Sequence, residues 1–102
     1  MKVLSVNELK QKIDNGETIH LIDVREPHEN AEFNIGGILL PLGKVQTMQI
    51  EAIEDLKATP VIVYCRSGNR SMQAAMILEQ LGFEDVTNLA GGMLAWENAF
   101  GR

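Results

Sequence analysis

Cys65 is the residue of this chain best suited to nucleophilic chemistry. It is the only cysteine among 102 residues, and it follows the apolar run "VIVY" as the first residue of a short polar loop, "CRSGNRS". A single cysteine cannot form an internal disulfide or a C-x-x-C redox pair, and by itself it cannot build a thiolate metal site. Two interpretations follow: a small residue packed in the core, or a lone nucleophile.

The composition of the loop favours the nucleophile. Gly68 and Asn69 are the residue types most tolerant of positive φ, so successive backbone N–H groups can curl around an anion and form a nest. A helix predicted to start near Ser71 adds its positive end, and the two arginines of the loop add full charges. Because helix N-termini and cationic neighbours lower the pKa of cysteine thiols, we predict that Cys65 is largely thiolate at neutral pH.

The remainder of the chain predicts alternating helices and strands. The capping-box pattern of Ser5 and Glu8 opens a short helix that stops at Gly16. Further helices are predicted over residues 44–60, where Pro60 closes the segment, 71–82 and 91–100, with a turn of helix within 27–37. Strands are predicted over residues 18–26, 38–42, 61–64 and 85–89. This alternation indicates right-handed crossovers and a mainly parallel sheet covered on both sides.

One of these predicted helices has a distinct apolar face. In the segment 44–60, the residues that helical spacing places on this face are Val45, Met48, Ala52, Ile53 and Leu56.

Two strand ends carry the candidate functional residues. In open α/β sheets, ligands bind beyond the carboxyl ends of the strands, and Cys65 stands at such an end. Asp23 and Arg25 stand at the end of another predicted strand. These two side chains could support the active site, or they could form a buried ion pair that orders the loops.

Composition excludes several functional classes. Fourteen acidic and nine basic side chains give a formal charge of -5 with no basic tract, so the electrostatic footprint of a nucleic-acid-binding protein is missing. The longest apolar runs are too short for a membrane span, and the first residues turn polar too soon for a signal peptide. We expect a single domain over residues 1–102, a cytoplasmic location and no nucleic-acid or membrane partner.

Three separated motifs give the chain a family resemblance. They are "LIDVREPHE" at residues 21–29, "CRSGNRS" at 65–71 and "NLAGGMLAW" at 88–96. With these motifs in this order, the chain resembles a single-domain rhodanese of the rhodanese-like sulfurtransferase family. The resemblance implies an α/β fold with a central, mainly parallel five-stranded sheet and helices on both faces.

The resemblance also implies an activity without any cofactor. In that family the loop cysteine accepts a sulfane sulfur from thiosulfate or a similar donor, becomes a persulfide, and passes the sulfur to a thiol or cyanide. Carried onto this sequence, Cys65 is the nucleophile, and Asp23 and Arg25 are possible support. The loop that binds the anionic substrate would comprise Arg66, Ser67, Gly68, Asn69, Arg70 and Ser71.

Loop length separates this activity from its nearest competitor. Tyrosine phosphatases and arsenate reductases of similar fold have five residues between cysteine and arginine, a loop sized for a tetrahedral oxyanion. Here four residues separate Cys65 from Arg70. The tighter loop favours transfer of a single sulfur atom over phosphatase chemistry.

A second functional class remains open. The domain could be a persulfide sulfur carrier or interaction module that serves a protein partner in sulfur delivery. Because the chain has no resolving cysteine, the sulfur must leave to an outside nucleophile. Its partners would be a small-molecule donor such as thiosulfate, together with a thiol or thioredoxin-like acceptor or a sulfur-delivery protein.

Other conspicuous side chains receive structural interpretations. Trp96, Met93 and Leu94 are predicted to pack the last helix onto the sheet. His20 and His28 are assigned no role, because sulfur transfer from a thiolate needs no general base.

Overall fold

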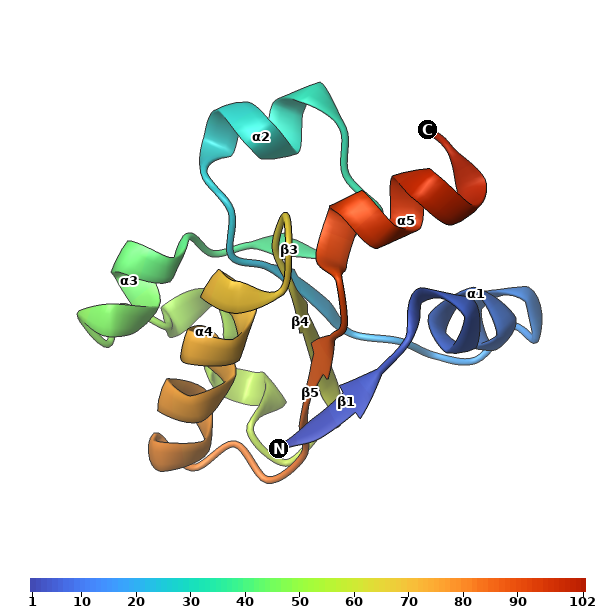
Figure 1. Ribbon diagram of the computed structural model, residues 1–102. Helices are drawn as coiled ribbons and strands as arrows, with labels where there is room; N and C mark the ends of the chain where they lie inside the picture. The colour runs from blue at the N-terminus through green and yellow to red at the C-terminus, as the bar shows by residue number, and fades with distance from the viewer.

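Five short parallel strands form the centre of the molecule. The computed structural model describes all 102 residues. The strands lie side by side in the order β1-β5-β4-β2-β3, and every neighbouring pair is parallel (Figure 1). Their bounds are β1 Lys2–Leu4, β2 Leu21–Asp23, β3 Ile38–Leu39, β4 Val61–Tyr64 and β5 Val86–Leu89. The predicted α/β fold with a mainly parallel five-stranded sheet is confirmed.

The central strand β4 shows how the sheet is buried. All four of its residues are buried, and successive side chains point to opposite faces of the sheet. Val61 and Val63 belong to one apolar cluster, and Ile62 and Tyr64 belong to the other. The continuous apolar run "VIVY" therefore reflects a strand that is covered on both sides.

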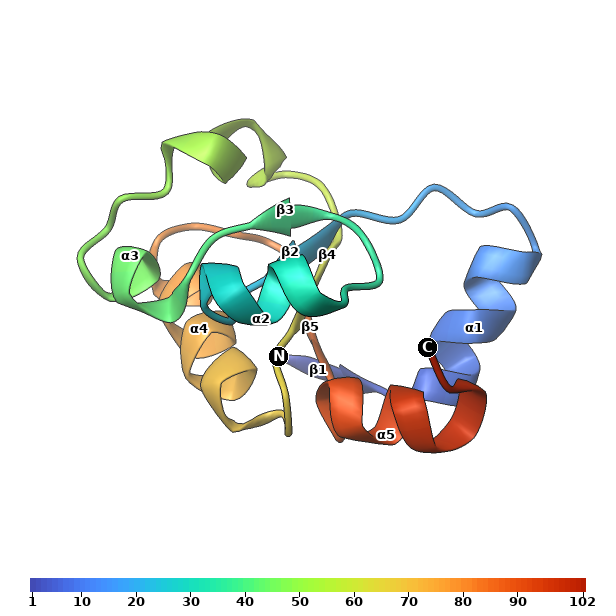
Figure 2. The ribbon, with the colours of Figure 1, turned by 90° about the horizontal axis from the view of Figure 1, so that it is seen from above.

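Helices cover the two faces of the sheet. Figures 1 and 2 show α3 and α4 on one side and α1 and α5 on the other. Helix α2 lies beyond the carboxyl ends of the strands, above the loop that carries Cys65. The helical segments are α1 Val6–Asp14, α2 Pro27–Glu32, α3 Leu42–Gln46, the 3-10 helix η1 Glu51–Leu56, α4 Asn69–Gln80 and α5 Gly92–Phe100.

The predicted capping box opens α1. The Ser5 hydroxyl accepts the Glu8 amide at 3.1 Å, and the Glu8 carboxylate accepts the Ser5 amide at 3.0 Å. Two N–H groups that the first turn would otherwise leave without partners are satisfied reciprocally. This pair fixes the start of α1 directly after the edge strand β1.

Two predictions about the elements were wrong. Strand β1 was missed, because it is only three residues long and Lys2 and Val3 are exposed, so it carries no apolar run. The helix predicted within residues 44–60 is broken: Met48 has φ +59, a left-handed conformation that no α-helix accommodates. Met48 and Ala52 are therefore exposed rather than on one buried face.

Met48 is the only non-glycine residue with positive φ, and its side chain is 66% exposed. We predict that Met48→Gly raises the free energy of unfolding by about 0.5–1 kcal/mol, because relief of the left-handed strain exceeds the entropy that glycine loses on folding. Met48→Ala, which keeps the strain, should be close to neutral. Urea unfolding of the three proteins measures this; a destabilised glycine variant would contradict it.

Candidate active site

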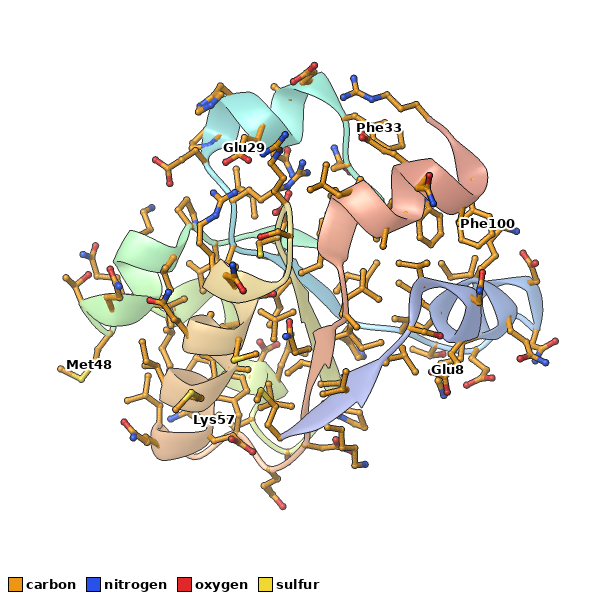
Figure 3. All side chains as sticks on the ribbon, in the orientation of Figure 1. Glu8, Glu29, Phe33, Met48, Lys57 and Phe100 are labelled. Atoms are coloured by element: carbon orange, nitrogen blue, oxygen red, sulfur yellow. The ribbon has the colours of Figure 1, made fainter.

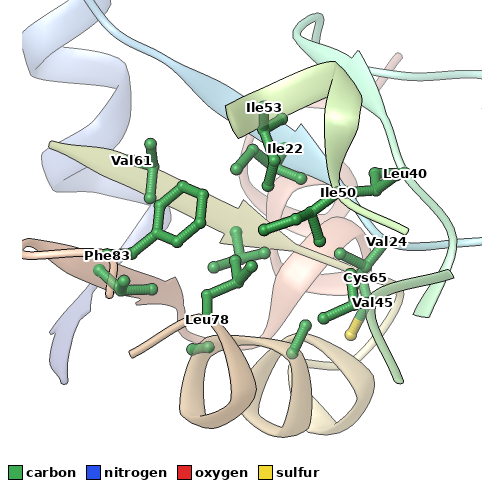
Figure 4. Packing of buried hydrophobic residues seen from close by; sticks show 14 residues of the cluster. Ile22, Val24, Leu40, Val45, Ile50, Ile53, Val61, Cys65, Leu78 and Phe83 are labelled. Carbon is green, nitrogen blue, oxygen red and sulfur yellow. The ribbon is translucent and has the colours of Figure 1, made fainter. Parts of the chain in front are cut away.

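The loop between β4 and α4 presents Cys65 at the carboxyl end of the central strand. Cys65 is fully buried, in the same cluster as Val24 and Val45 (Figure 4). Gly68 has φ +102 and stands at the N-cap of α4, so the left-handed conformation predicted for the loop falls on its glycine. The helix begins at Asn69, two residues before the predicted start.

Hydrogen-bond donors converge on the sulfur of Cys65. The amide of Gly68 donates to Sγ at 3.1 Å and the amide of Ser71 at 3.3 Å. The Ser71 hydroxyl lies 3.3 Å from Sγ, where either atom could be the donor. A sulfur packed only as an apolar group would not have this set of hydrogen-bond donors around it. Cys65 therefore combines the burial of a core residue with the contacts of a bound anion.

The first turn of α5 holds the loop from its other side. The amides of Met93 and Leu94 donate to the carbonyl oxygens of Cys65 and Arg66, each at 2.9 Å. This close approach is possible because Gly92 has no side chain: with φ +53, an added Cβ would collide with the Cys65 carbonyl oxygen. The "GGM" segment therefore serves as a support for the loop.

The pKa of Cys65 is set by two opposing effects. Burial raises it, since a buried thiolate loses hydration. The hydrogen bonds from the hydroxyl and amide of Ser71, and from the amides of Gly68 and Ser67, outweigh burial, so the pKa of Cys65 lies below its ordinary value. The direction agrees with the predicted thiolate character, and its source is neutral dipoles of the loop.

Arg70, one of the two arginines predicted to stabilise the thiolate, has a partner that sequence reasoning missed. Its two terminal nitrogens donate to the two carboxylate oxygens of Glu29 at 2.7 and 2.9 Å. Figure 3 shows Glu29 reaching from α2 toward the start of α4. This ion pair lowers the pKa of Glu29 to about 2, chiefly through the Arg70 hydrogen bonds and against burial. Arg70 therefore ties α2 to the loop.

Arg66, the other arginine of the loop, is exposed. It lines a hollow of about 310 Å³ between α2 and α5. The walls of the hollow carry both signs of charge and comprise Arg25, His28, Glu29, Glu32, Arg66, Met93, Leu94, Glu97 and Arg102. Exposed Ser67 and Asn69 complete the surface of the loop.

Asp23 and Arg25 form a buried ion pair. Nε and one terminal nitrogen of Arg25 donate to the Asp23 carboxylate, both at 2.9 Å. Asn30 donates to the same carboxylate at 2.9 Å, and Arg25 also reaches the Phe33 carbonyl at 2.8 Å. The pair thus anchors the middle and the C-terminal end of α2, the ordering role that was one of its two predicted alternatives.

The aromatic ring beneath this pair is also tied to the neighbouring loop. The Arg25 guanidinium lies 5.6 Å from the centre of the Tyr64 ring, and the Tyr64 hydroxyl donates to the Gly36 carbonyl at 2.9 Å. Burial, followed by the nearby Asp23 charge, raises the pKa of Tyr64 to about 12. Tyr64 is therefore a neutral donor at physiological pH.

Asn88 is a second residue that the sequence analysis did not single out. It is buried on β5, where its side chain contacts Ser71 and the carbonyl group of Gly68. An amide within an apolar strand, "VTNL", is the signal that could have identified it, because a buried amide needs designated partners.

The structural interpretations of the last helix hold for two of three residues. Trp96 and Met93 are buried in the cluster that α1 and α5 share with the sheet, whereas Leu94 is exposed and lines the hollow beside Arg66. His28 lines the same hollow. His20 lies at the opposite, amino ends of the strands.

Fold and cysteine loop can be compared with those of known proteins. Residues 5–99 match the family model of the rhodanese-like domain. The chain belongs to the rhodanese-like domain family, and the predicted resemblance is confirmed.

Several known proteins of similar sequence or structure are named as sulfurtransferases or sulfur carriers. A sulfurtransferase of Allochromatium vinosum is 39% identical over 86% of this chain and 80% of its own length. The human single-domain sulfurtransferase TSTD1 superposes with a TM-score of 0.79 at 25% identity, covering 96% of each chain. The Bacillus subtilis protein named "Putative sulfur carrier protein YrkF" is 35% identical over 91% of this chain, which spans only 49% of it. Sulfur transfer in general is the activity that these relatives support.

No helix is both long and apolar enough to cross a membrane.

Gly92 should be intolerant of any side chain. Gly92→Ala is expected to lower the free energy of unfolding by at least about 2 kcal/mol, from left-handed strain plus the collision with the loop carbonyls. Gly16→Ala is the matched control, because Gly16 also has positive φ but an added Cβ meets nothing within 4 Å. Equal losses in the two variants, measured by denaturant unfolding, would show that close approach is unimportant.

The Glu29–Arg70 pair should contribute stability that depends on pH. Because the pKa of Glu29 falls from 4.5 to about 2 on folding, its contribution is present above pH 4.5 and is lost as the pH falls toward 2. Glu29→Gln should therefore be less stable than wild type at neutral pH, with a difference that shrinks over that window. Glu32→Gln, an exposed carboxylate of the same helix, should show little difference at any pH.

Proposed function

We propose that this chain transfers a sulfane sulfur from thiosulfate or a similar donor, through a persulfide on Cys65, to a thiol or cyanide acceptor. The observation that carries the proposal is the convergence of the Gly68 and Ser71 donors on one buried sulfur. Such donors stabilise negative charge on Sγ, and sulfur transfer places charge there in the resting thiolate.

The first half of the proposed reaction loads the sulfur. The Cys65 thiolate attacks the outer sulfur of thiosulfate, and a bond forms between that sulfur and Sγ. The sulfur–sulfur bond of the donor breaks, and sulfite leaves with the bonding electron pair. The product is a persulfide whose terminal sulfur keeps the negative charge that it carried in thiosulfate, while sulfite takes away the charge that the thiolate brought.

The second half of the reaction passes the outer sulfur of the persulfide to the acceptor. An acceptor thiolate or cyanide attacks the outer sulfur, the bond to Sγ breaks, and its electron pair returns to Sγ. Cys65 is then a leaving group, so the donors that lower its pKa also assist its departure. No proton has to be abstracted, and His28 in the adjacent hollow needs no role.

The loop residues have different parts in this proposal. Gly68 and Ser71 supply donors, while exposed Arg66 supplies the cationic charge that a free anionic donor meets first. Arg70 acts through its bond to Glu29 and keeps α2 against the loop. Ser67 adds a backbone donor for the sulfur, and Asn69 completes the turn.

A persulfide carrier that receives sulfur from a protein is the second candidate. Two observations favour it: Cys65 is fully buried, and the charge of Arg70 is already satisfied by Glu29, so a small anion finds limited attraction. The similarity to the named sulfur carrier of Bacillus subtilis points the same way. A reducing compartment such as the cytoplasm would keep the single thiol reduced in either case.

Intact mass measurement tests the proposal directly. The reduced chain and Cys65→Ser are each incubated with thiosulfate, or with a persulfidated protein, and freed of small molecules. We expect wild type alone to gain the mass of one sulfur atom from thiosulfate, and to lose it on addition of cyanide. A gain only from the protein donor would favour the carrier, and no gain from either donor would refute sulfur transfer through Cys65.

A further inference from the structure

We propose that Asn88 is a positioning residue that competes with Cys65 for the hydroxyl proton of Ser71. The three side chains form one buried chain of contacts, from Sγ of Cys65 to Oγ of Ser71 at 3.3 Å and from Oγ to Oδ1 of Asn88 at 2.5 Å. The inference rests on the proposed role of Cys65 as the nucleophile and assigns a function to a residue outside the cysteine loop.

The orientation of the Asn88 amide is fixed by the loop. Its Nδ2 donates to the carbonyl oxygen of Gly68 at 3.2 Å. A flipped amide would set two acceptor oxygens against each other, so Oδ1 is the atom that faces Ser71. Oδ1 can only accept, and the hydroxyl of Ser71 is the partner that it has in the structure.

The proton of Ser71 has only two well-matched acceptors. The hydroxyl is also placed to donate to the Gly68 carbonyl oxygen at 3.1 Å, but that oxygen accepts the Met72 amide at 3.1 Å and the Asn88 amide as well. Two lone pairs are thereby filled. A third bond to that oxygen is weak, so the stronger acceptors for the hydroxyl proton are Oδ1 of Asn88 and Sγ of Cys65.

The neutral thiol satisfies every group in the chain. Cys65 donates its S–H to Oγ of Ser71, and Ser71 donates its O–H to Oδ1 of Asn88. No buried side-chain nitrogen or oxygen of this protein lacks a hydrogen-bond partner, and this arrangement keeps that condition.

The thiolate creates a conflict. If the hydroxyl turns toward Sγ, the buried Oδ1 of Asn88 loses its donor; if the hydroxyl stays on Asn88, a lone pair of Oγ faces the negative sulfur. Both outcomes oppose the charged form, since an unpaired buried acceptor and a repulsive contact each raise its free energy. Asn88 therefore limits how far Ser71 stabilises the thiolate.

This competition gives the hydroxyl a reason to move during sulfur transfer. In the persulfide, Sγ is divalent and uncharged, so Asn88 is the better acceptor. As the outer sulfur departs, charge returns to Sγ and the hydroxyl can follow it. Asn88 thus favours the loaded state over the free thiolate.

No charged side chain contacts Sγ, so none controls the charge on the sulfur in the way proposed for Asn88. Arg70 of α4 is paired with Glu29 of α2, and Arg66 faces solvent. On the β2 side, the charges of Asp23 and Arg25 are paired with each other. Helix α5 contributes only backbone amides, directed at loop carbonyls.

The ultraviolet absorbance of the thiolate provides the test, because no reagent has to reach the buried sulfur. Each protein is titrated against its Cys65→Ser counterpart, which also subtracts Tyr64. Asn88→Leu, nearly equal in shape but without polar atoms, should move the inflection to lower pH. At a fixed pH below the inflection its thiolate fraction should rise by roughly three- to tenfold, the effect of one freed hydrogen bond.

The Ser71→Ala background distinguishes competition from mere support of the loop. Ser71→Ala should move the inflection to higher pH, and adding Asn88→Leu to it should produce no further shift. A residue that only supported the loop would raise the inflection when replaced, in both backgrounds. The inference would be overturned if Asn88→Leu raised the pH of the inflection or left it unchanged. It would also be overturned if Asn88→Leu lowered that pH equally in the wild-type and Ser71→Ala backgrounds.

Two further measurements guard against variants that fail to fold. Asn88→Val, a substitution suited to a strand, should shift the inflection in the same direction as Asn88→Leu. In the wild-type chain, the side-chain amide resonance of Asn88 should titrate together with Cys65, and an amide signal independent of that titration would refute the coupling. No sulfur donor is used, so failure of sulfur transfer in the mass experiment would leave these outcomes interpretable.

Discussion

Two hydrogen bonds from the first turn of α5 determine which way the peptide groups of the cysteine loop face. The amides of Met93 and Leu94 hold the carbonyl oxygens of Cys65 and Arg66 on the side away from the sulfur. In a planar trans peptide the N–H points opposite to the C=O, so turning the Arg66 carbonyl outward turns the Ser67 amide inward. That amide is one of the donors that lower the pKa of Cys65. The sulfur chemistry of one loop thus depends on the backbone of a helix some thirty residues further along the chain.

The same segment connects this support to the polar network beneath the sulfur. Strand β5 supplies Asn88, and the glycine turn that follows it supplies the close approach of Gly92. On the other side of the loop, the buried Asp23–Arg25 pair anchors α2, which in turn places Glu29 on Arg70. Each of these contacts joins segments distant in sequence, so the loop is held by tertiary structure from both sides.

The parts of this arrangement that were predictable are those with a local cause. The run "VIVY", the Ser5–Glu8 capping box and the loop glycine each depend on a few neighbouring residues, and their predicted structures were found. The edge strand at Lys2–Leu4 gains its structure by pairing with β5, which no local pattern reveals. The break at Met48 could not be foreseen either, since methionine is a good helix former. Its left-handed conformation closes the end of α3, where the amides of Met48 and Gln49 bond back to the carbonyl groups of Val45 and Lys44. The partners of Arg70 and Ser71 lie 41 and 17 residues away, respectively, and only the fold brings them together.

Complete burial of Cys65 gives these contacts their importance. A buried thiolate is stabilised only by what touches it, because water cannot supply the missing hydration. The groups that touch Sγ are neutral dipoles: amides of the loop and one hydroxyl. Neutral dipoles stabilise a charge at short range but attract no free anion from solution, whereas the nearby full charge of Arg70 is compensated by Glu29. The site is thus better built to hold negative charge on its own sulfur than to gather small anions, and in the proposed reaction the exposed Arg66 is the group left to bring a donor to the loop.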